Sequence, residues 1–311
     1  MSSFITVALF VYNRPEHVRR TLAALAQNSL AHKVELLVFC DGPKTPEQAE
    51  PVNLVRKAVR TAEGFASIRI VERERNLGLA RSIISGVTEA FENRDRVIVL
   101  EDDIVTSPDF LSYISSALDF YQNDLSVFSV TGFQFPILIP DNYKYDAYFS
   151  YRSSSWGWGT WKNRWTAVDW DVRDYALFRR DRASRKIFNR GGDDLANMLD
   201  RQMRGEIDSW AIRWAFAHYR NNAFCLFPVK SRVRNIGFDG SGTHCETKDG
   251  VNAELFSSQD NGSLRFPARG ELNAEIIRAF FNLNSLPLRS RVKNWIEDLF
   301  WNIIRQRHGR S

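Results

Sequence analysis

Residues 96–110 read RVIVLEDDIVTSPDF. The apolar, β-type run Arg96–Leu100 ends directly in three acids, Glu101, Asp102 and Asp103. Ser107-Pro108-Asp109 then begins a helix, in which apolar residues recur at helical spacing as far as Tyr121. The order of this stretch is therefore strand, acidic turn, helix.

The acidic turn carries the chemistry of this stretch. Adjacent carboxylates at the end of a buried strand repel one another and lose hydration, so a protein tolerates them where a cation neutralises their charge. Mg²⁺ and Mn²⁺ bind carboxylate oxygens and usually share their site with substrate phosphates. We therefore expect a site for metal and phosphate after Leu100. The alternative is a solvated acidic turn that begins a helix.

Upstream of the acids, short apolar strands alternate with helices. We expect strands at Ile5–Tyr12, Leu36–Phe39 and Ile68–Val71, and helices after Asn13 and at Pro46–Thr61 and Leu79–Phe91. Such alternation predicts an α/β fold with a mostly parallel central sheet flanked by helices. Ligands bind at the carboxyl ends of the strands in such sheets. Asn13-Arg14 and Asp41-Gly42 join the acids there.

Downstream of the acidic turn, the hydrophobic periodicity weakens. The expected order is a strand at Val127–Thr131, a Trp- and Gly-rich stretch, charged helices over Arg173–Arg204, a helix at Trp210–Tyr219, a strand at Cys225–Pro228 and a Gly-rich loop at Asn235–His244. We expect a single large domain over residues 1–260, followed by a C-terminal helical extension over residues 261–311.

Composition limits the class of protein. The 311 residues are 44% hydrophobic and 25% charged, as in soluble globular proteins. Cys40, Cys225 and Cys245 show no CxxC spacing, so we expect free thiols and neither a disulfide framework nor a zinc site. The start of the chain lacks the basic region of a signal peptide, and no apolar run reaches membrane-spanning length. These features favour a cytoplasmic protein.

Several ligand classes lack their motifs. The net charge of +5 permits anionic partners, but without a recognition motif we expect no nucleic acid. The first strand runs into Tyr12-Asn13-Arg14-Pro15, so the Gly-rich phosphate loop of sugar nucleotidyltransferases is missing there. A Rossmann GxGxxG and a Walker A sequence are missing as well. A nucleotidyltransferase therefore stays an alternative with an argument against it.

Four segments, taken in order, resemble a known family. They are VALFVYNRPEHVRRTLAAL, LLVFCDG, NLGLARSIISGVTEAF and VIVLEDDIVTSPDFLSYISSAL. Their order and spacing resemble the GT-A glycosyltransferases, especially the N-acetylglucosaminyltransferase I group and bacterial family 2-like relatives, over roughly residues 5–245. The resemblance implies a Rossmann-like GT-A sheet and an inverting, metal-dependent transfer of sugar. The donor would be a UDP-sugar such as UDP-GlcNAc, and the acceptor a hydroxyl of a glycan or lipid-linked glycan.

The resemblance also implies roles for the residues at the strand ends. Residues 1–105 would bind the nucleotide sugar, and residues 106–260 would form the acceptor side and a loop over the donor. Asp103 would be the ligand of Mn²⁺ or Mg²⁺, and the remaining expected donor contacts are Tyr12, Asn13, Arg14, Asp41, Asn76, Arg81, Glu101 and Asp102. For Arg14 and Asp41, helix-cap and turn chemistry is the alternative.

Inverting transfer needs one general base that takes the proton of the acceptor hydroxyl. The segment EIDSWAIRW resembles the one that carries this base, which implies Asp208 with Trp210 beside it. Glu206 is a nearby competitor, and capping of the following helix is the other role open to Asp208. In the Gly-rich loop, Gly242 and His244 would lie over the donor.

The Trp-rich stretch SSSWGWGTWKNRW covers residues 153–165, between the acids and Asp208. Trp faces stack on sugar rings, and glycines allow close approach. We therefore expect Trp156, Gly157 and Trp158, together with Trp210, to contact sugar or acceptor, and Trp161 and Trp165 to lie in the core. A non-catalytic saccharide-binding protein is the alternative that these tryptophans leave open.

The C-terminal segment SRVKNWIEDLFWNIIRQRHGR places its apolar residues on one helical face. A terminal helix packed on the core is one interpretation. The other is peripheral contact with an anionic membrane at its inner face, which would suit a lipid-linked acceptor.

Overall fold

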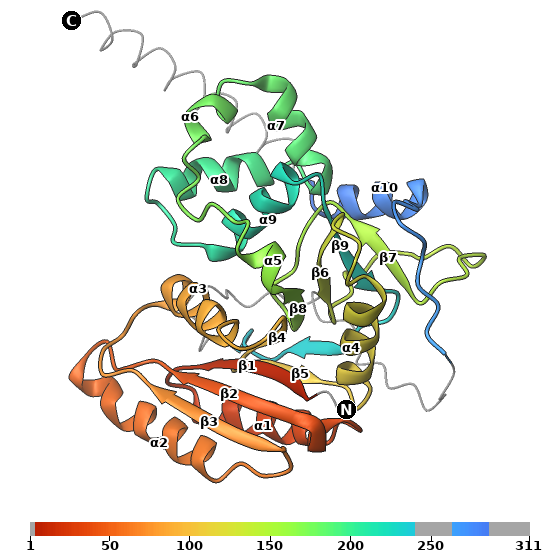
Figure 1. The fold of residues 1–311 in the computed structure, drawn as a ribbon. Helices are drawn as coiled ribbons and strands as arrows, with labels where there is room; N and C mark the ends of the chain where they lie inside the picture. Colours follow the sequence, from red (N-terminus) through yellow and green to blue (C-terminus); the bar gives the residue numbers. More distant parts are fainter. Residues whose placement is uncertain (1–3, 240–262, 286–311) are drawn as a thin grey trace, which may run out of the picture.

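The computed structural model describes residues 4–239 and 263–285. Its core is an eight-stranded sheet in the order β3-β2-β1-β4-β8-β6-β9-β7 (Figure 1). The strands are β1 (Ile5–Val11), β2 (Val34–Cys40), β3 (Ser67–Glu72), β4 (Arg96–Glu101), β6 (Val127–Thr131), β7 (Ala147–Ser150), β8 (Trp158–Trp161) and β9 (Phe224–Pro228). Only β7 and β8 run antiparallel to their neighbours in this sheet. The expected α/β fold with a mostly parallel sheet is confirmed.

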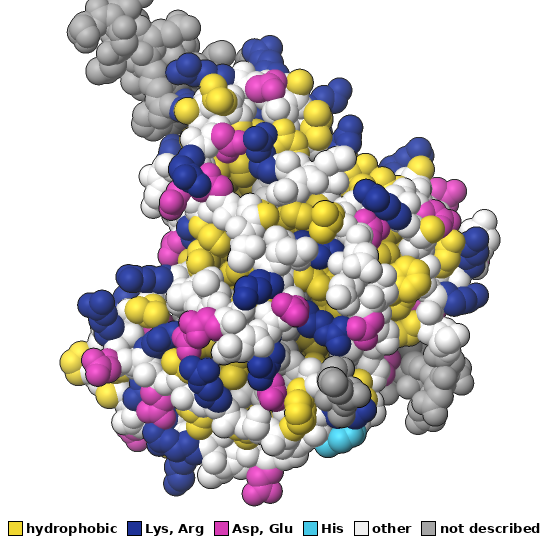
Figure 2. Space-filling view, viewed as in Figure 1, with side chains coloured by type: hydrophobic (Ala, Val, Ile, Leu, Met, Phe, Trp, Pro, Cys, Tyr) yellow, Lys and Arg dark blue, Asp and Glu magenta, His cyan; other side chains and the backbone are white. Residues whose placement is uncertain are grey.

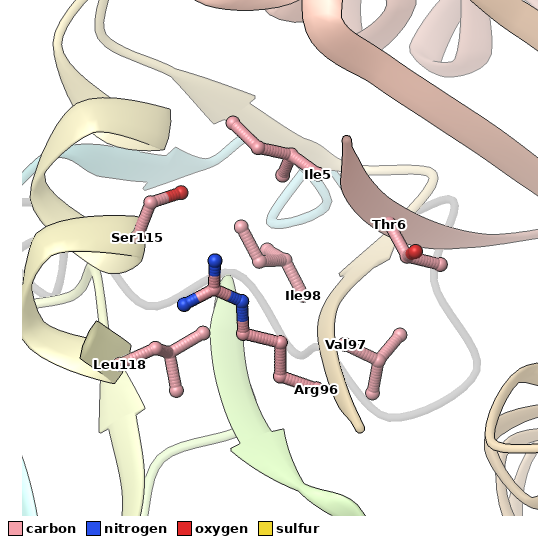
Figure 3. A pocket seen from close by; sticks show the side chains of 7 residues that line it. All are labelled: Ile5, Thr6, Arg96, Val97, Ile98, Ser115 and Leu118. Carbon is pink, nitrogen blue, oxygen red and sulfur yellow. The ribbon is translucent and has the colours of Figure 1, made fainter. Parts of the chain in front are cut away.

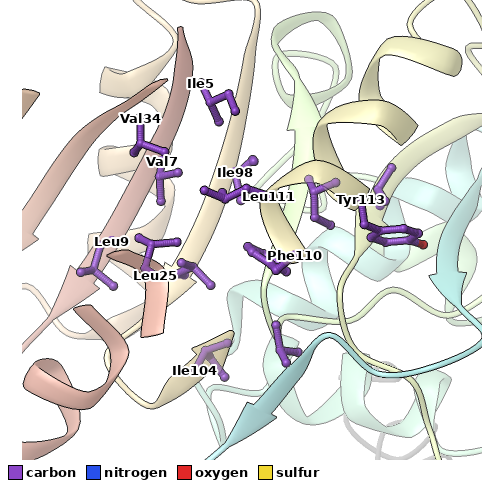
Figure 4. Close-up of a cluster of buried hydrophobic side chains, with 14 of the residues drawn as sticks. Ile5, Val7, Leu9, Leu25, Val34, Ile98, Ile104, Phe110, Leu111 and Tyr113 are labelled. Atoms are coloured by element: carbon purple, nitrogen blue, oxygen red, sulfur yellow. The ribbon is translucent and has the colours of Figure 1, made fainter. Parts of the chain in front are cut away.

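Helices cover both faces of the sheet. Alternate residues of β1 point to opposite faces, so Val7 and Leu9 join one buried cluster and Ala8 and Phe10 the other. The first cluster lies under α1 (Pro15–Ala26), α2 (Ala49–Arg60) and α4 (Phe110–Phe120), and Figure 4 shows part of it. The second cluster lies under α3 (Leu79–Ala90), α5 (Lys162–Trp165) and α9 (Trp210–Arg220).

A helical lobe stands beside the sheet at the top of Figure 1. It consists of α6 (Tyr175–Phe178), α7 (Arg182–Phe188) and α8 (Leu195–Met203), packed on α9 around Phe178, Phe188 and Phe216. Inside it, Arg185 donates to both oxygens of Asp200, at 2.9 and 2.7 Å. The lobe corresponds to the charged helices expected over residues 173–204.

A two-stranded antiparallel ladder lies at the carboxyl end of β4. It pairs β5 (Ile104–Thr106) with β10 (Val233–Asn235), and Asn235 lies opposite Ile104. The ladder therefore carries the chain after residue 235 back to the acidic turn. The sequence does not predict β5, β7, β8 and β10, because strands of three or four residues are too short to show an alternation of apolar and polar residues.

Part of the expected C-terminal extension also packs on the sheet. Helix α10 (Ala274–Leu283) buries Ile276 and Phe280, and the Phe280 ring lies 5.2 Å from that of Phe227 on β9. The amphipathic segment expected to form a terminal helix lies outside the described residues. Within the described ranges, no helix combines the length and the apolar character needed to cross a membrane.

Candidate active site

The acidic turn meets the end of the first strand. Because β1 and β4 are parallel neighbours, with Phe10 opposite Glu101, the residues that follow them lie side by side. Arg14 donates from Nη2 to Oδ2 of Asp103 at 2.9 Å and is also hydrogen-bonded to Asp102. The structure thus brings together Arg14, Asp102 and Asp103, as the sequence predicted.

The charges at this edge are unbalanced. Asp102 and Asp103 are both buried, and burial raises the pKa of Asp102 above its usual value. Burial, followed by the charges of Asp103 and Asp102, raises the pKa of Glu101 to about 8. Burial works to lower the pKa of Arg14, but the two aspartates outweigh it and raise the value. One arginine therefore faces three acids, which is an environment that attracts a further cation.

The end of β10 covers the acids. The backbone N–H of Ile236 donates to the carbonyl oxygen of Asp103 at 2.9 Å, and that of Gly237 donates to Oδ1 of Asn235 at 2.7 Å. A Cβ atom on Gly237 would collide with the Asp103 carboxylate. Glycine at this position lets the backbone lie directly against the acid. Sequence analysis placed Asn235 and Gly237 in a donor loop but did not single them out.

Helix α1 supplies two further residues that sequence analysis missed. Thr21 donates from Oγ1 to the carbonyl oxygen of Asp102 at 2.8 Å and is fully buried. His17 Nε2 lies 3.2 Å from the carbonyl oxygen of Ile236 and 3.2 Å from Oδ2 of Asp239. His17 stands one turn after Arg14, and Thr21 stands two turns after it. The available signal in the sequence was two polar side chains, four residues apart, on the apolar face of the helix.

The donor set suits a cation shared with phosphate. Among residues 4–239 and 263–285, no group of three or more His, Cys, Asp or Glu side chains could by itself hold a metal ion. Oxygens of Asp102 and Asp103 nevertheless converge on one guanidinium nitrogen of Arg14. Mg²⁺ and related ions are commonly bound by one or two carboxylates together with substrate phosphates. The residues present fit a metal of that kind.

Asp41 makes the hydrogen bonds of a turn, which was the alternative to a donor contact. It is buried, and its carboxylate accepts from the backbone N–H groups of Gly42, Leu77 and Gly78 at 2.9–3.2 Å. This contact ties the end of β2 to the start of α3, and a donor contact would be additional to it. Asn76 belongs to the same junction and donates to the carbonyl oxygen of Gly42 at 3.1 Å.

Three other expected donor contacts lie at or near the surface. Tyr12 is half-buried, is hydrogen-bonded to Gln48 and accepts from the backbone N–H of Lys44 at 3.1 Å. Asn13 is half-buried, and Arg81 is exposed on α3. Gly242 and His244 lie outside the described residues, so their expected roles stay predictions.

Asp208 does not cap α9. The cap is Ser209, whose Oγ accepts from the backbone N–H of Ile212 at 3.3 Å. The Asp208 side chain is 71% exposed and accepts from Nη2 of Arg213 at 3.2 Å. Arg213 is itself held by the carbonyl oxygens of Ser209 and Trp170. Sequence analysis missed Arg213, although it stands one helical turn inside α9, where it can reach back to the cap.

Glu206, the competitor for the role of base, is already engaged. It pairs with Arg204 at 2.5 Å and with Arg201 at 3.5 Å. The hydrogen bond from Arg204 holds the pKa of the Glu206 carboxyl below its usual value. Glu206 is thus engaged by two arginines, whereas Asp208 is paired with one.

The placement of the tryptophans corrects one expectation. Trp158 is fully buried, and its ring stacks on those of Trp210 and Trp165 at 5.2 and 5.9 Å. It therefore presents no face to a sugar, and Trp210 is buried in the same stack. The reason is the strand β8, which inserts the WGTW sequence between β4 and β6. Trp161 is buried too, so the expected core placement of Trp161 and Trp165 is confirmed.

Trp156 is the half-buried ring of this stretch. Its ring lies 4.3 Å from the ring of Phe133 and 5.6 Å from that of Phe238. Phe238 directly follows Gly237, whose backbone covers Asp103. Gly157 adopts a φ of +55°, and a Cβ there would collide with Val233. Trp156 and Gly157 are therefore the part of the stretch that adjoins the acidic turn.

Two pockets in the described part of the chain lie elsewhere. One is a cavity of about 10 Å³ between Ile5, Arg96 and Leu118 (Figure 3), which is room for about one water molecule. The other, of about 300 Å³, is lined by Phe4, Arg94 and Trp161. Both lie at the amino ends of β1 and β4, at the opposite edge of the sheet from the acids.

The expected free thiols agree with the structure where it describes them. Cys40 and Cys225 are free and buried, and burial raises the pKa of each thiol to about 12. Cys245 lies outside the described residues.

A mostly parallel α/β sheet with an acidic turn at the carboxyl end of a central strand is the architecture of the GT-A glycosyltransferases. The chain belongs to glycosyl transferase family 2, whose family model matches residues 6–183. It is therefore a glycosyltransferase, which sets aside the nucleotidyltransferase and the non-catalytic saccharide-binding protein. A search of curated proteins found no match.

Solved structures similar to this chain include other glycosyltransferases. The mannosyltransferase PcManGT from Pyrobaculum calidifontis, in complex with GDP-Man and Mn²⁺, is 14% identical with a TM-score of 0.40, covering 69% of this chain and 73% of its own. S. aureus TarS 1–349 is 12% identical with a TM-score of 0.42, covering 74% of this chain and 59% of its own. At these TM-scores the similarity carries no argument about donor, metal or acceptor.

Proposed function

We propose that this glycosyltransferase is metal-dependent and inverting, and that it transfers a sugar from a UDP-sugar, with UDP-GlcNAc as the first candidate, to a hydroxyl of a glycan or lipid-linked glycan. The observation that supports the proposal best is the edge where β1 and β4 end. Three acids face one arginine there. The backbone of Gly237 covers them so closely that a side chain at this position would displace it.

Donor binding is assigned to the strand ends. Asp103, with Asp102 beside it, would hold Mn²⁺ or Mg²⁺, and the ion would stabilise the departing diphosphate. Arg14 donates to the same carboxylates, and it would contact the nucleotide or its phosphates. Tyr12, Asn13, Asp41, Asn76, Arg81 and Glu101 are the other residues assigned to the donor.

Proton removal is assigned to Asp208. Its exposed carboxylate would take the proton of the acceptor hydroxyl, and Arg213 would hold it in place at 3.2 Å. Trp156 and Gly157 would form the wall of the sugar site, with Trp210 supporting Asp208 from the aromatic stack. Trp158 is given no direct contact with sugar.

A screen of nucleotide sugars tests this proposal. Thermal shift of the full-length protein would be measured with UDP-, GDP- and dTDP-sugars, each with Mn²⁺, Mg²⁺ or EDTA. The expected result is stabilisation by a UDP-sugar in the presence of a divalent ion. Equal stabilisation in EDTA would rule out the metal, and stabilisation by GDP-sugars alone would rule out the proposed donor. NMR of the isolated product would then report whether the anomeric configuration has inverted.

A further inference from the structure

The outer side of the helical lobe exposes aliphatic side chains among cations. Leu177 on α6 is 75% exposed and Ile187 on α7 is 44% exposed. Figure 2 shows basic and apolar side chains, with some acidic ones among them, over this lobe at the top of the view. We call this the α6–α7 surface, and it consists of Leu177, Arg180, Arg182, Lys186 and Ile187.

Helix geometry places the α7 members of this surface on one side of that helix. In α7, residues four apart lie above one another, so Arg182 and Lys186 share a row next to that of Ala183 and Ile187. The other side of α7 faces inward, where Phe188 is buried and Arg185 pairs with Asp200. In α6, Leu177 precedes Phe178, which is buried in the lobe. The exposed residues therefore form an outward surface and not the edge of the core.

Within the described residues, the cations of this surface form no ion pair. The ion pairs of the lobe use other arginines: Arg173 with Asp169, Arg185 with Asp200 and Arg220 with Asp174. Arg180, Arg182 and Lys186 have no acidic partner within the described residues. Asp181 lies between them, but its carboxylate accepts from Ala183 N and Ser184 Oγ at the start of α7. Its charge is thus partly engaged by the helix itself.

We infer that the α6–α7 surface binds an anionic phospholipid bilayer. Lipid phosphates complement Arg180, Arg182 and Lys186, and the boundary of the acyl chains takes up Leu177 and Ile187. Exposed aliphatic side chains favour a lipid over a nucleic acid, because the charged phosphate backbone of a nucleic acid offers no apolar region to Leu177 and Ile187. This inference goes beyond the transferase activity and does not depend on its details.

Flotation with liposomes tests the inference. Full-length protein is mixed with vesicles of phosphatidylcholine alone or with 30% phosphatidylglycerol, as wild type and as Arg180→Gln/Arg182→Gln/Lys186→Gln. At about fivefold per cation near an anionic surface, the triple variant should bind on the order of 100-fold more weakly. Leu177→Gln/Ile187→Gln should also weaken binding. The matched control is Arg20→Gln/Lys57→Gln/Arg278→Gln, which removes the same charge from exposed positions on α1, α2 and α10.

The expected result is flotation of wild type and control with anionic vesicles only, and loss of flotation for the α6–α7 variants. Each variant would be checked by thermal unfolding, so that a misfolded protein is not scored as unbound. Equal flotation of the triple variant and wild type would overturn the inference. So would an equal loss in the control, which would show dependence on net charge alone, or no flotation of wild type at all.

Discussion

Arg14 and Asp103 lie 89 positions apart in the sequence, yet Nη2 of Arg14 donates to Oδ2 of Asp103 at 2.9 Å. The contact joins the ends of two neighbouring parallel strands and lies under the backbone of Ile236 and Gly237. It places a guanidinium where the proposed metal would also be attracted. The balance of charge at this edge should therefore depend on both cations.

Replacing Arg14 by Gln tests this balance without any substrate. The variant leaves the buried acids without their arginine, and removing one partner of a buried ion pair costs about 3 kcal/mol. We expect the free energy of unfolding in EDTA to fall by about that amount, and Mn²⁺ to restore more stability in the variant than in wild type. Denaturant unfolding with Mn²⁺ or EDTA measures both. An unchanged stability in EDTA would show that the pair is not a stabilising contact.

Gly237→Ala should weaken metal-dependent donor binding by at least about tenfold, because the added methyl meets the Asp103 carboxylate. The φ of Gly237 is outside the left-handed region, so the contact alone opposes the substitution. Gly205→Ala is the control. It has a φ of +75° and nothing near its Cβ, so it should lose about 1 kcal/mol of stability and keep donor binding. Calorimetric titration of nucleotide sugar distinguishes the two variants.

A pH dependence of stability follows from His218. Its Nδ1 donates to the carbonyl oxygen of Trp214 and its Nε2 accepts from Ser129, both at 2.8 Å. Burial lowers the pKa of His218 to about 4, against about 6.5 in an unfolded chain. Between those values the unfolded chain binds a proton that the folded protein refuses, so stability falls as the pH falls. From pH 7.5 to pH 5 the contribution of His218 alone should be a loss of about 2 kcal/mol. Glu101 contributes with the opposite sign over this range, because its pKa is raised in the folded protein, so the His218 contribution is measured as the difference between wild type and a variant without the histidine.

His218→Gln should lack this contribution, because glutamine does not titrate, so its stability relative to wild type should rise by about 2 kcal/mol from pH 7.5 to pH 5. Denaturant unfolding of both proteins at pH 7.5 and pH 5 gives the comparison. Parallel pH profiles would mean that His218 does not account for the acid sensitivity.

The sequence was enough to predict the donor half of the fold. Strands of six or seven residues that alternate with helices carry a period long enough to recognise, and the strand-end rule then places Arg14 beside Asp103. After residue 133 it was enough for the lobe helices, α9 and β9, but not for the short strands. There β7, β8 and β10 have three or four residues, and tertiary packing decides their position.

Trp158 shows how this limit affected the prediction of the site. A Trp-Gly-Trp pattern suits a sugar platform, but insertion of β8 into the sheet turns Trp158 into the aromatic core. Gly237 and Arg213 were missed for a related reason. Gly237 matters because it contacts Asp103 across the β5–β10 ladder. Arg213 matters because it donates to Asp208, and this hydrogen bond can be predicted only once α9 is known to begin at Trp210.

Asp208→Asn should leave binding of UDP and UDP-sugar intact and lower kcat by at least about 100-fold, the range expected for loss of a general base. Arg213→Gln should lower kcat by a smaller factor with KM for the donor unchanged, because it acts by holding Asp208. Arg213→Lys should restore part of the loss. The measurement is steady-state release of UDP.

Glu206→Gln is the matched control for Asp208, since it removes an exposed acid from the same loop. It should keep turnover near that of wild type. Near-wild-type turnover of Asp208→Asn would show that the base lies elsewhere, and the rest of the donor site would be unaffected by that result.

The most direct test of the central claim is calorimetric titration of the UDP-sugar chosen by the screen into wild type and Asp103→Ala, with Mn²⁺ and with EDTA. Asp119→Ala, an exposed acid at the other end of the sheet, is the control. The account predicts binding to wild type and control in Mn²⁺ only, and no binding to a folded Asp103→Ala protein. Equal affinity of Asp103→Ala and wild type in Mn²⁺, or equal affinity of wild type in Mn²⁺ and EDTA, would contradict it.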